Sequence, residues 1–117
     1  MAEPVILYIT VPNREEGVAL GRTLVDENLA ACANVIDGLT SIFRWEGEVQ
    51  EDTEALLVAK TERALVDPAT DLIKMEHSYD CPCVVAIPIV GGCCRRKSQE
   101  TVGSPARGVL CVDGGAA

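Results

Sequence analysis

The sequence lacks the motifs on which most small enzymes depend. It contains a single histidine, no phosphate-binding loop, no glycine-rich dinucleotide fingerprint and no recognisable nucleophile signature. These absences leave no residue to which a catalytic role can be assigned. We therefore expect a binding protein and not an enzyme.

Long apolar runs and an excess of basic charge are also missing. No run reaches the roughly 18 apolar residues that a membrane-spanning helix needs, and the first ten residues do not resemble a secretory signal. The formal net charge of -8 disfavours binding to phosphate backbones and anionic membranes. We expect a cytoplasmic protein with no nucleic-acid or membrane partner, and cationic partners fit the charge better.

The end of the chain differs in charge and composition from the rest. Residues 1–92 carry 16 acidic and 6 basic side chains, whereas residues 93–117 carry 2 and 4. The final segment is also rich in glycine, serine and charged residues and has little periodicity. The sequence predicts one compact domain over residues 1–92 and a divergent, poorly ordered tail over residues 93–117, with a short extended piece near 109–112.

Hydrophobic periodicity predicts six elements within the compact domain. Runs rich in β-branched residues predict strands, and apolar residues at helical intervals predict two helices, the first capped by Asn13 and ending near Cys32. The strands are expected at 5–11, 34–45 with a kink at Asp37-Gly38, 55–61 and 84–90, and the second helix at 62–77. The order predicts an α+β fold, a ferredoxin-like βαββαβ sandwich with an antiparallel sheet and two helices on one face.

Three segments of the chain resemble the CutA family of divalent-cation tolerance proteins. They are ENLAACANVI at 27–36, TSIFRWEGEVQEDTEALLVAKT at 40–61 and HSYDCPCVVAIPI at 77–89. The resemblance covers roughly residues 5–92 and implies a ferredoxin-like homotrimer whose long hairpins pair between subunits. The tail departs from the family, because relatives continue with a short C-terminal helix where this chain has Cys93-Cys94-Arg95-Arg96-Lys97.

The resemblance also implies metal ligands. His77 matches the histidine of the family's His-x-Tyr motif and Cys32 matches the cysteine of its Ala-Ala-Cys motif, two groups proposed to bind copper. Both residues have a structural alternative. Cys32 could pack as a small apolar residue, and His77 could cap the end of the second helix.

Cys81 and Cys83 form a second candidate for metal binding. Without a signal segment, the six cysteines are read as free thiols or metal ligands and not as disulfides. Residues two apart in an extended chain project to the same side, so this pair could offer two thiolates to one soft ion such as Cu(I). Packing at the start of a strand is the alternative. We predict a copper ion as the ligand, with other divalent transition metals as further candidates.

Four residues match positions that line the family's inter-subunit cleft: Trp45, Lys60, Thr61 and Tyr79. The lysine, the phenol and the indole could hold a small anion, or all four could belong to a structural interface. The leading hypothesis is therefore a non-enzymatic homotrimeric metal-binding protein involved in divalent-cation (copper) tolerance. The alternative is a trimeric sensor of a small anionic metabolite or nucleotide.

Overall fold

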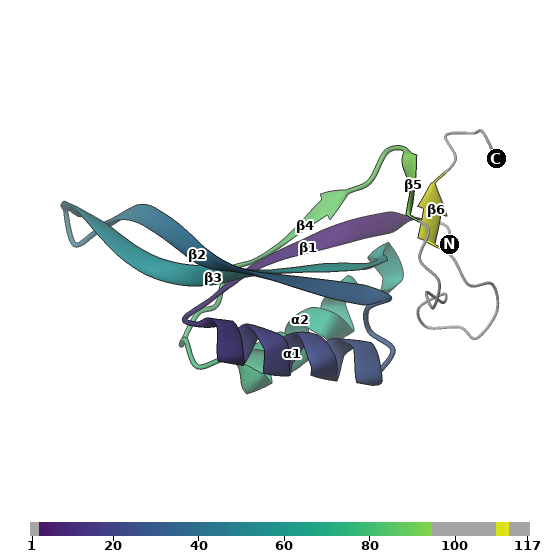
Figure 1. Cartoon of the computed structure of the whole chain (residues 1–117), viewed down its shortest axis with the longest axis horizontal. Helices are drawn as coiled ribbons and strands as arrows, with labels where there is room; N and C mark the ends of the chain where they lie inside the picture. The colour runs from purple at the N-terminus through teal and green to yellow at the C-terminus, as the bar shows by residue number, and fades with distance from the viewer. Residues whose placement is uncertain (1–2, 95–109, 113–117) are drawn as a thin grey trace.

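The computed structural model describes residues 3–94 and 110–112, whose main body is a four-stranded antiparallel sheet covered by helices on one face (Figure 1). The four main strands run in the order β2-β3-β1-β4, and the predicted α+β ferredoxin-like arrangement is confirmed. The elements are β1 (Pro4–Val11), α1 (Arg14–Asp26), β2 (Cys32–Trp45), β3 (Glu48–Glu62), a 3-10 turn η1 (Arg63–Leu65), α2 (Val66–Glu76), β4 (Val84–Pro88), β5 (Gly92–Cys94) and β6 (Leu110–Val112).

The core lies between the sheet and the two helices. Alternate residues of β1 and β3 face the helices, and Leu7, Ile9 and Leu57 are fully buried there. Leu24 of α1 and Ile73 of α2 close the core from the other side. This alternation follows from strand geometry, because residues with a period of two line one face of a strand.

Helix α1 begins as predicted and ends earlier than predicted. The Asn13 side chain accepts a 2.8 Å hydrogen bond from the Glu16 backbone N–H, which satisfies one of the free donors at the helix start. The helix ends at Asp26 because Asn28 adopts a left-handed conformation with φ of 59°, which asparagine tolerates better than most residues. The prediction of helix as far as Cys32 is wrong, and Cys32 instead begins β2.

The β2–β3 hairpin is longer than the sequence predicts. The expected kink appears as a register shift between Ile36 and Leu39, next to Gly38 with φ of 78°. At the tip, Glu46 and Gly47 have φ of 50° and 85°, the two positive values that suit a two-residue hairpin turn. Strand β3 begins at Glu48 and not at residue 55. Acidic residues have low strand propensity, but pairing with β2 keeps this acidic stretch in the sheet.

Helix α2 accommodates the proline that complicates its prediction. Pro68 is the third residue of α2, within the first turn, where a backbone N–H would have no helical partner. Residues 63–65 ahead of it form a 3-10 turn. The predicted helix over 62–77 is therefore confirmed in type and shortened at its start. Strand β4 ends at Pro88, two residues before the predicted end.

The second face of the sheet carries no helix (Figure 1). Strand register places Ile36, Val85 and Ile87 on this face, where their exposed fractions are 53%, 46% and 43%. Tyr8 and Val58 lie between them and are half-buried. We call this surface the open face. It is an apolar sheet surface without a cover in the described part of one chain.

A two-stranded sheet forms from β5 and β6. The predicted extended piece near 109–112 corresponds to β6, which pairs antiparallel with β5. The rest of the predicted tail, residues 95–109 and 113–117, lies outside the described residues. The division into a domain over 1–92 and a tail over 93–117 remains a prediction.

Candidate functional site

His77 occupies the junction between α2 and β4 and is engaged through both ring nitrogens. Its Nε2 lies 2.8 Å from the Thr10 carbonyl oxygen, and its Nδ1 lies 3.0 Å from the Tyr79 backbone N–H. A carbonyl oxygen only accepts, so Nε2 carries the proton and Nδ1 accepts from Tyr79. His77 is also the C-cap of α2. The residue is buried, and these contacts match the structural alternative of helix capping.

Tyr79 is the second fixed point of this junction. Its hydroxyl donates a 2.6 Å hydrogen bond to Glu54 Oε2 on β3, and Ser41 on β2 donates to the other oxygen of the same carboxylate. Burial raises the pKa of the Tyr79 phenol well above its usual range, assisted by the Glu54 hydrogen bond and by the negative charges of Glu54, Asp52 and Glu16. The Tyr79 phenol therefore stays protonated and neutral beside these carboxylates.

Glu16 supplies the third fixed point. Its Oε2 accepts a 2.9 Å hydrogen bond from the Ser78 backbone N–H and lies 3.4 Å from His77 Nδ1. In the sequence, Glu16 stands three residues after the helix cap Asn13, a position that predicts no role at this junction. Its carboxylate belongs to the junction, and no local motif indicates a contact over 62 residues of sequence. The same holds for Glu54, 25 residues from Tyr79.

These contacts define a tethered loop over residues 77–83. The loop is tied to α1 through Glu16, to β1 through Thr10 and to β3 through Glu54. Cys81 and Cys83 lie at its end as free, exposed thiols. One short segment therefore carries His77, Tyr79, Cys81 and Cys83. Within it, Cys81 and Cys83 present exposed thiol groups to solvent.

Cys32 lies elsewhere on the sheet. It is opposite Lys60 on β3, whereas Thr10, the partner of His77, is opposite Leu56. Four residues of strand correspond to about 13 Å. Cys32 is therefore separated from the His77 junction within one chain, and the assignment of Cys32, His77, Cys81 and Cys83 as metal ligands remains a prediction.

The four predicted cleft residues are also spread out along one chain. Trp45 is opposite Glu48 near the hairpin tip and is 58% exposed, about 40 Å of strand from Lys60. Thr61 is fully buried, and its hydroxyl donates a 2.7 Å hydrogen bond to the Leu29 carbonyl. Any cleft that contains Trp45 and Lys60 needs more than one chain.

In the described part of one chain, no group of three or more His, Cys, Asp or Glu side chains is placed to hold a metal ion. Cys81 and Cys83 fit a soft ion as two sulfur donors. His77 fits only if Nδ1 releases the Tyr79 backbone N–H, because its other nitrogen is protonated and directed at Thr10.

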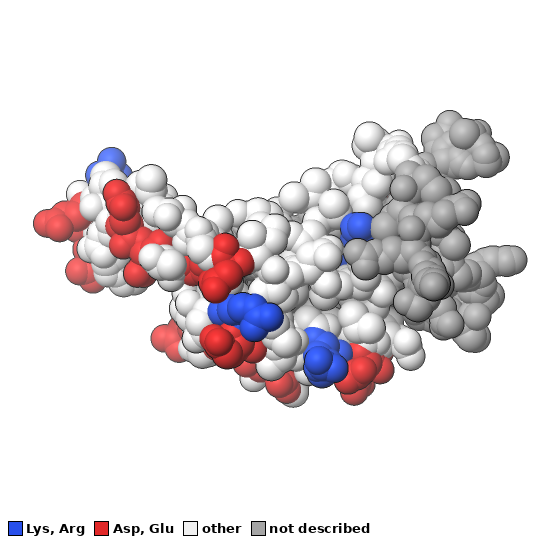
Figure 2. Space-filling view, in the orientation of Figure 1, with Lys and Arg blue, Asp and Glu red and all other residues white. Residues whose placement is uncertain are grey.

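Acidic side chains gather along the β2–β3 hairpin, as Figure 2 shows for one face of the molecule. They are Glu46, Glu48, Glu51, Asp52 and Glu54. Of these, Glu54 and Asp52 act on Tyr79 at the junction. The hairpin thus places negative charge beside the tethered loop.

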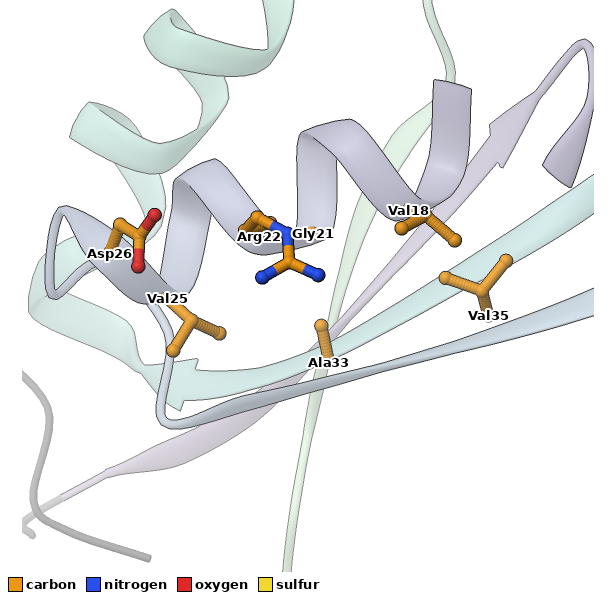
Figure 3. A pocket seen from close by; sticks show the side chains of 7 residues that line it. All are labelled: Val18, Gly21, Arg22, Val25, Asp26, Ala33 and Val35. Atoms are coloured by element: carbon orange, nitrogen blue, oxygen red, sulfur yellow. The ribbon is translucent and has the colours of Figure 1, made fainter. Parts of the chain in front are cut away.

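A separate shallow groove runs between α1 and β2 (Figure 3). Its lining residues are Val18, Gly21, Arg22, Val25, Asp26, Ala33 and Val35. The groove contains none of the predicted ligands. Gly21 lines it because α1 approaches the sheet closely: a Cβ there would lie 3.1 Å from Ala33 Cβ and from Leu57 Cδ1.

In the described residues, no helix is long and apolar enough to cross a membrane.

Comparison with known proteins gives a consistent result. Residues 5–95 match the model of the CutA1 divalent ion tolerance protein family. The chloroplastic protein CutA of Arabidopsis thaliana is 48% identical over 75% of this chain and 48% of its own length. The divalent-cation tolerance protein CutA of Thermus thermophilus is 47% identical over 74% of this chain and 84% of its own length. The chain thus spans about half the length of the plant relative and most of the bacterial one.

A solved structure shows the same fold. The crystal structure of CutA1 from Oryza sativa superposes with a TM-score of 0.75 at 46% identity, covering 77% of this chain and 83% of that chain. The long hairpin and the junction that carries the tethered loop both lie within residues 5–95, the region that matches the family model.

Proposed function

From the finding that this chain belongs to the CutA1 divalent ion tolerance protein family, we propose that it is a non-enzymatic homotrimer that binds copper and supports tolerance of divalent cations. A relation to divalent ions follows from the family itself, which is named for tolerance and not for a catalysed reaction. The choice of copper, the trimer and the absence of catalysis are proposals, and each has its own support.

The sign of the charge around Tyr79 is the observation that carries the proposal. Glu54, Asp52 and Glu16 all favour the neutral phenol over the phenolate, so the potential beside the tethered loop is negative. A negative potential attracts cations and repels anions. This opposes the alternative function, a sensor in which Tyr79 helps to hold an anionic metabolite or nucleotide.

The donors on the tethered loop support copper in particular. Two exposed thiols, Cys81 and Cys83, are sulfur ligands of the kind that select Cu(I). His77 supplies a third donor only after Nδ1 exchanges the Tyr79 N–H for a metal. Cys32 lies too far away within one chain and would have to come from a neighbouring subunit. Magnesium and calcium prefer oxygen ligands and are poorer candidates.

The open face supports the homotrimer. Isolated exposed apolar residues are ordinary, but a contiguous apolar sheet face indicates an interface. Ile36, Val85 and Ile87 are each about half exposed in one chain. Strand register places Cys32 and Lys60 on the same face. Burial of this face between subunits would bring Lys60, and the cleft that it is proposed to line, against a second chain.

We also propose the cytoplasm as the location. A plant relative is named as chloroplastic, so membership of the family does not settle the compartment. The support for the cytoplasm is the pair of free, exposed thiols of Cys81 and Cys83, because thiols persist in reducing compartments such as the cytoplasm.

Ligand-induced stabilisation tests the choice between cation and anion. A ligand that binds only the folded state raises its stability by about 2.7 kcal/mol at a concentration one hundred times Kd. We expect copper to raise the melting temperature of the reduced protein, and nucleotides and magnesium to leave it unchanged. A rise with nucleotides and none with copper would favour the anion sensor and overturn the proposed function.

A further inference from the structure

The bulge in β2 places an aspartate and a glycine outside the strand register. The pairing with β3 passes from Ile36 to Leu39 and leaves Asp37 and Gly38 without a register partner. Both residues are exposed. Beyond the bulge, the β2–β3 hairpin extends past the two helices (Figure 1). The pair therefore lies on an accessible segment where the ladder of the sheet is interrupted.

The side chain of Asp37 contacts the backbone of its own neighbour. The Gly38 backbone N–H donates a 2.9 Å hydrogen bond to Asp37 Oδ1. The carboxyl carbon Cγ is bonded to that oxygen, so it lies within reach of the same nitrogen. A bond between this nitrogen and Cγ would close a five-membered ring. Holding two reacting groups together in one molecule removes much of the entropic barrier to their reaction.

Glycine at position 38 leaves the nitrogen open to this reaction. Gly38 has a φ of 78°, a conformation that favours glycine, and glycine has no side chain to shield its nitrogen. A Cβ built at this position meets nothing within 4 Å, so the fold leaves room for a ring. In the part of the chain that the structure describes, Asp37 is the only aspartate followed by glycine.

We propose that Asp37 is a site of spontaneous isomerisation to isoaspartate. The Gly38 nitrogen attacks Cγ of the carboxylic acid form of Asp37. A C–N bond forms and the C–OH bond breaks, and the hydroxyl group leaves with the amide proton as water. The product is a cyclic imide. Water then opens one of its two C–N bonds: opening at Cγ restores aspartate, and opening at the main-chain carbonyl gives isoaspartate. One water is lost and one is gained, so the mass is unchanged.

The modification changes the main chain at a point where two parts of β2 meet. Isoaspartate adds one carbon to the backbone and leaves the carboxylate on Cα, so the net charge is unchanged. On one side of the bulge, Val35 packs against the core. On the other side, Ser41 donates to Glu54, the carboxylate that holds Tyr79. Isomerisation therefore alters the spacing between the core and the hairpin, and it uses none of the proposed metal ligands.

Peptide mapping of the aged full chain tests the proposal. The reduced protein is incubated under physiological conditions and digested with trypsin, which releases residues 23–44 as one peptide. We expect a second form of this peptide with the same mass and a different retention time. Electron-transfer fragmentation should place isoaspartate at residue 37 and aspartate at Asp26, the internal control that is followed by Glu27.

An enzymatic assay gives an independent readout. A protein isoaspartyl methyltransferase with labelled S-adenosylmethionine should label the peptide of residues 23–44 from the aged protein and not from fresh protein. Asp113-Gly114 lies outside the described residues and falls in a separate tryptic peptide, residues 108–117. Label at that position is therefore counted separately.

Matched variants and a peptide identify the cause. Asp37→Glu should abolish the second form, because glutamate does not close a five-membered ring, and Asp26→Glu should leave it unchanged. Circular dichroism should show the parent fold in both variants. The folded chain should isomerise at least as fast as a synthetic peptide of residues 23–44. A rate in the folded chain about tenfold or more below that of the peptide would show that the fold opposes the reaction. That result, or isoaspartate at Asp26 instead of Asp37, would overturn the proposal.

Discussion

The Nε2 atom of His77 lies 2.8 Å from the carbonyl oxygen of Thr10, and this contact assigns the proton of the imidazole to Nε2. The remaining nitrogen then accepts from the Tyr79 backbone N–H. One buried side chain thereby joins the end of α2 to β1 and sets the start of the tethered loop. The structural and metal-binding roles of His77 compete for the same atom, Nδ1.

The structural role predicts a loss of stability in His77→Ala. The change leaves the Thr10 carbonyl and the Tyr79 N–H without their partners, at a cost of about 1–3 kcal/mol in the free energy of unfolding. Chemical denaturation measures the loss. Ser78→Ala is the control, because its backbone N–H still donates to Glu16, and it should stay within about 0.5 kcal/mol of the parent. Equal stability of His77→Ala and the parent would contradict the capping role.

Tyr79 predicts a specific alkaline titration. Its pKa is raised by burial, by Glu54 and by the neighbouring negative charges. Because the pKa is higher in the folded state than in the unfolded state, the contribution of Tyr79 to the free energy of unfolding is fully present below the ordinary tyrosine pKa of about 10. This contribution is lost as pH rises from that value through the folded-state pKa. The difference in phenolate absorbance between the parent and Tyr79→Phe should therefore be near zero at pH of about 10. A half-ionised Tyr79 at that pH would contradict the contact with Glu54.

Close packing of α1 predicts that Gly21 cannot carry a branched side chain. Gly21→Val places atoms against Ala33 and Leu57, which a Cβ alone already approaches to 3.1 Å. We expect a loss of about 1–3 kcal/mol from overpacking. Helix propensity cannot cause this loss, because valine is a better helix former than glycine. The control is Arg22→Val at an adjacent exposed position, where valine lowers helix propensity without overpacking and should cost about 0.5 kcal/mol or less. A Gly21→Val variant that is as stable as the parent would contradict the close packing.

The open face predicts the oligomeric state. Sedimentation of the parent should give a trimer, and Val85→Asp should give monomers because a carboxylate is costly to bury in an apolar interface. Met75→Asp is the control, since Met75 on α2 is 78% exposed and lies outside the open face. A parent that sediments as a 12.4 kDa monomer, or a Val85→Asp variant that remains trimeric, would contradict the proposed interface.

The sequence predicts the elements well because they depend on local signals. The β-branched run of β1, the cap at Asn13 and the Glu46-Gly47 turn each specify their own structure. The errors arise where a nonlocal partner decides. Strand β3 extends back to Glu48 because β2 pairs with it. The end of α1 at Asp26 is the exception, since the local reversal at Asn28 stops the helix.

The candidate site is predicted only in part for the same reason. His77, Tyr79, Cys81 and Cys83 are close in sequence, so a short segment brings them together. Glu16 and Glu54 contact this segment from distant positions, and neither residue belongs to a motif that indicates the contact. The separation of Cys32 from the others depends on sheet order, which a single sequence specifies weakly.

Competitive copper titration of the reduced protein tests the central claim most directly. The parent is compared with His77→Ala, with the Cys81→Ser/Cys83→Ser double variant and with the Ser78→Ala control, each checked to be folded and in the oligomeric state of the parent. The account predicts that copper binds more tightly than magnesium or calcium. It also predicts that the double variant loses affinity by about 10-fold to 100-fold, a loss that even supporting residues of metal sites produce. Parent affinity in both the double variant and His77→Ala would contradict it.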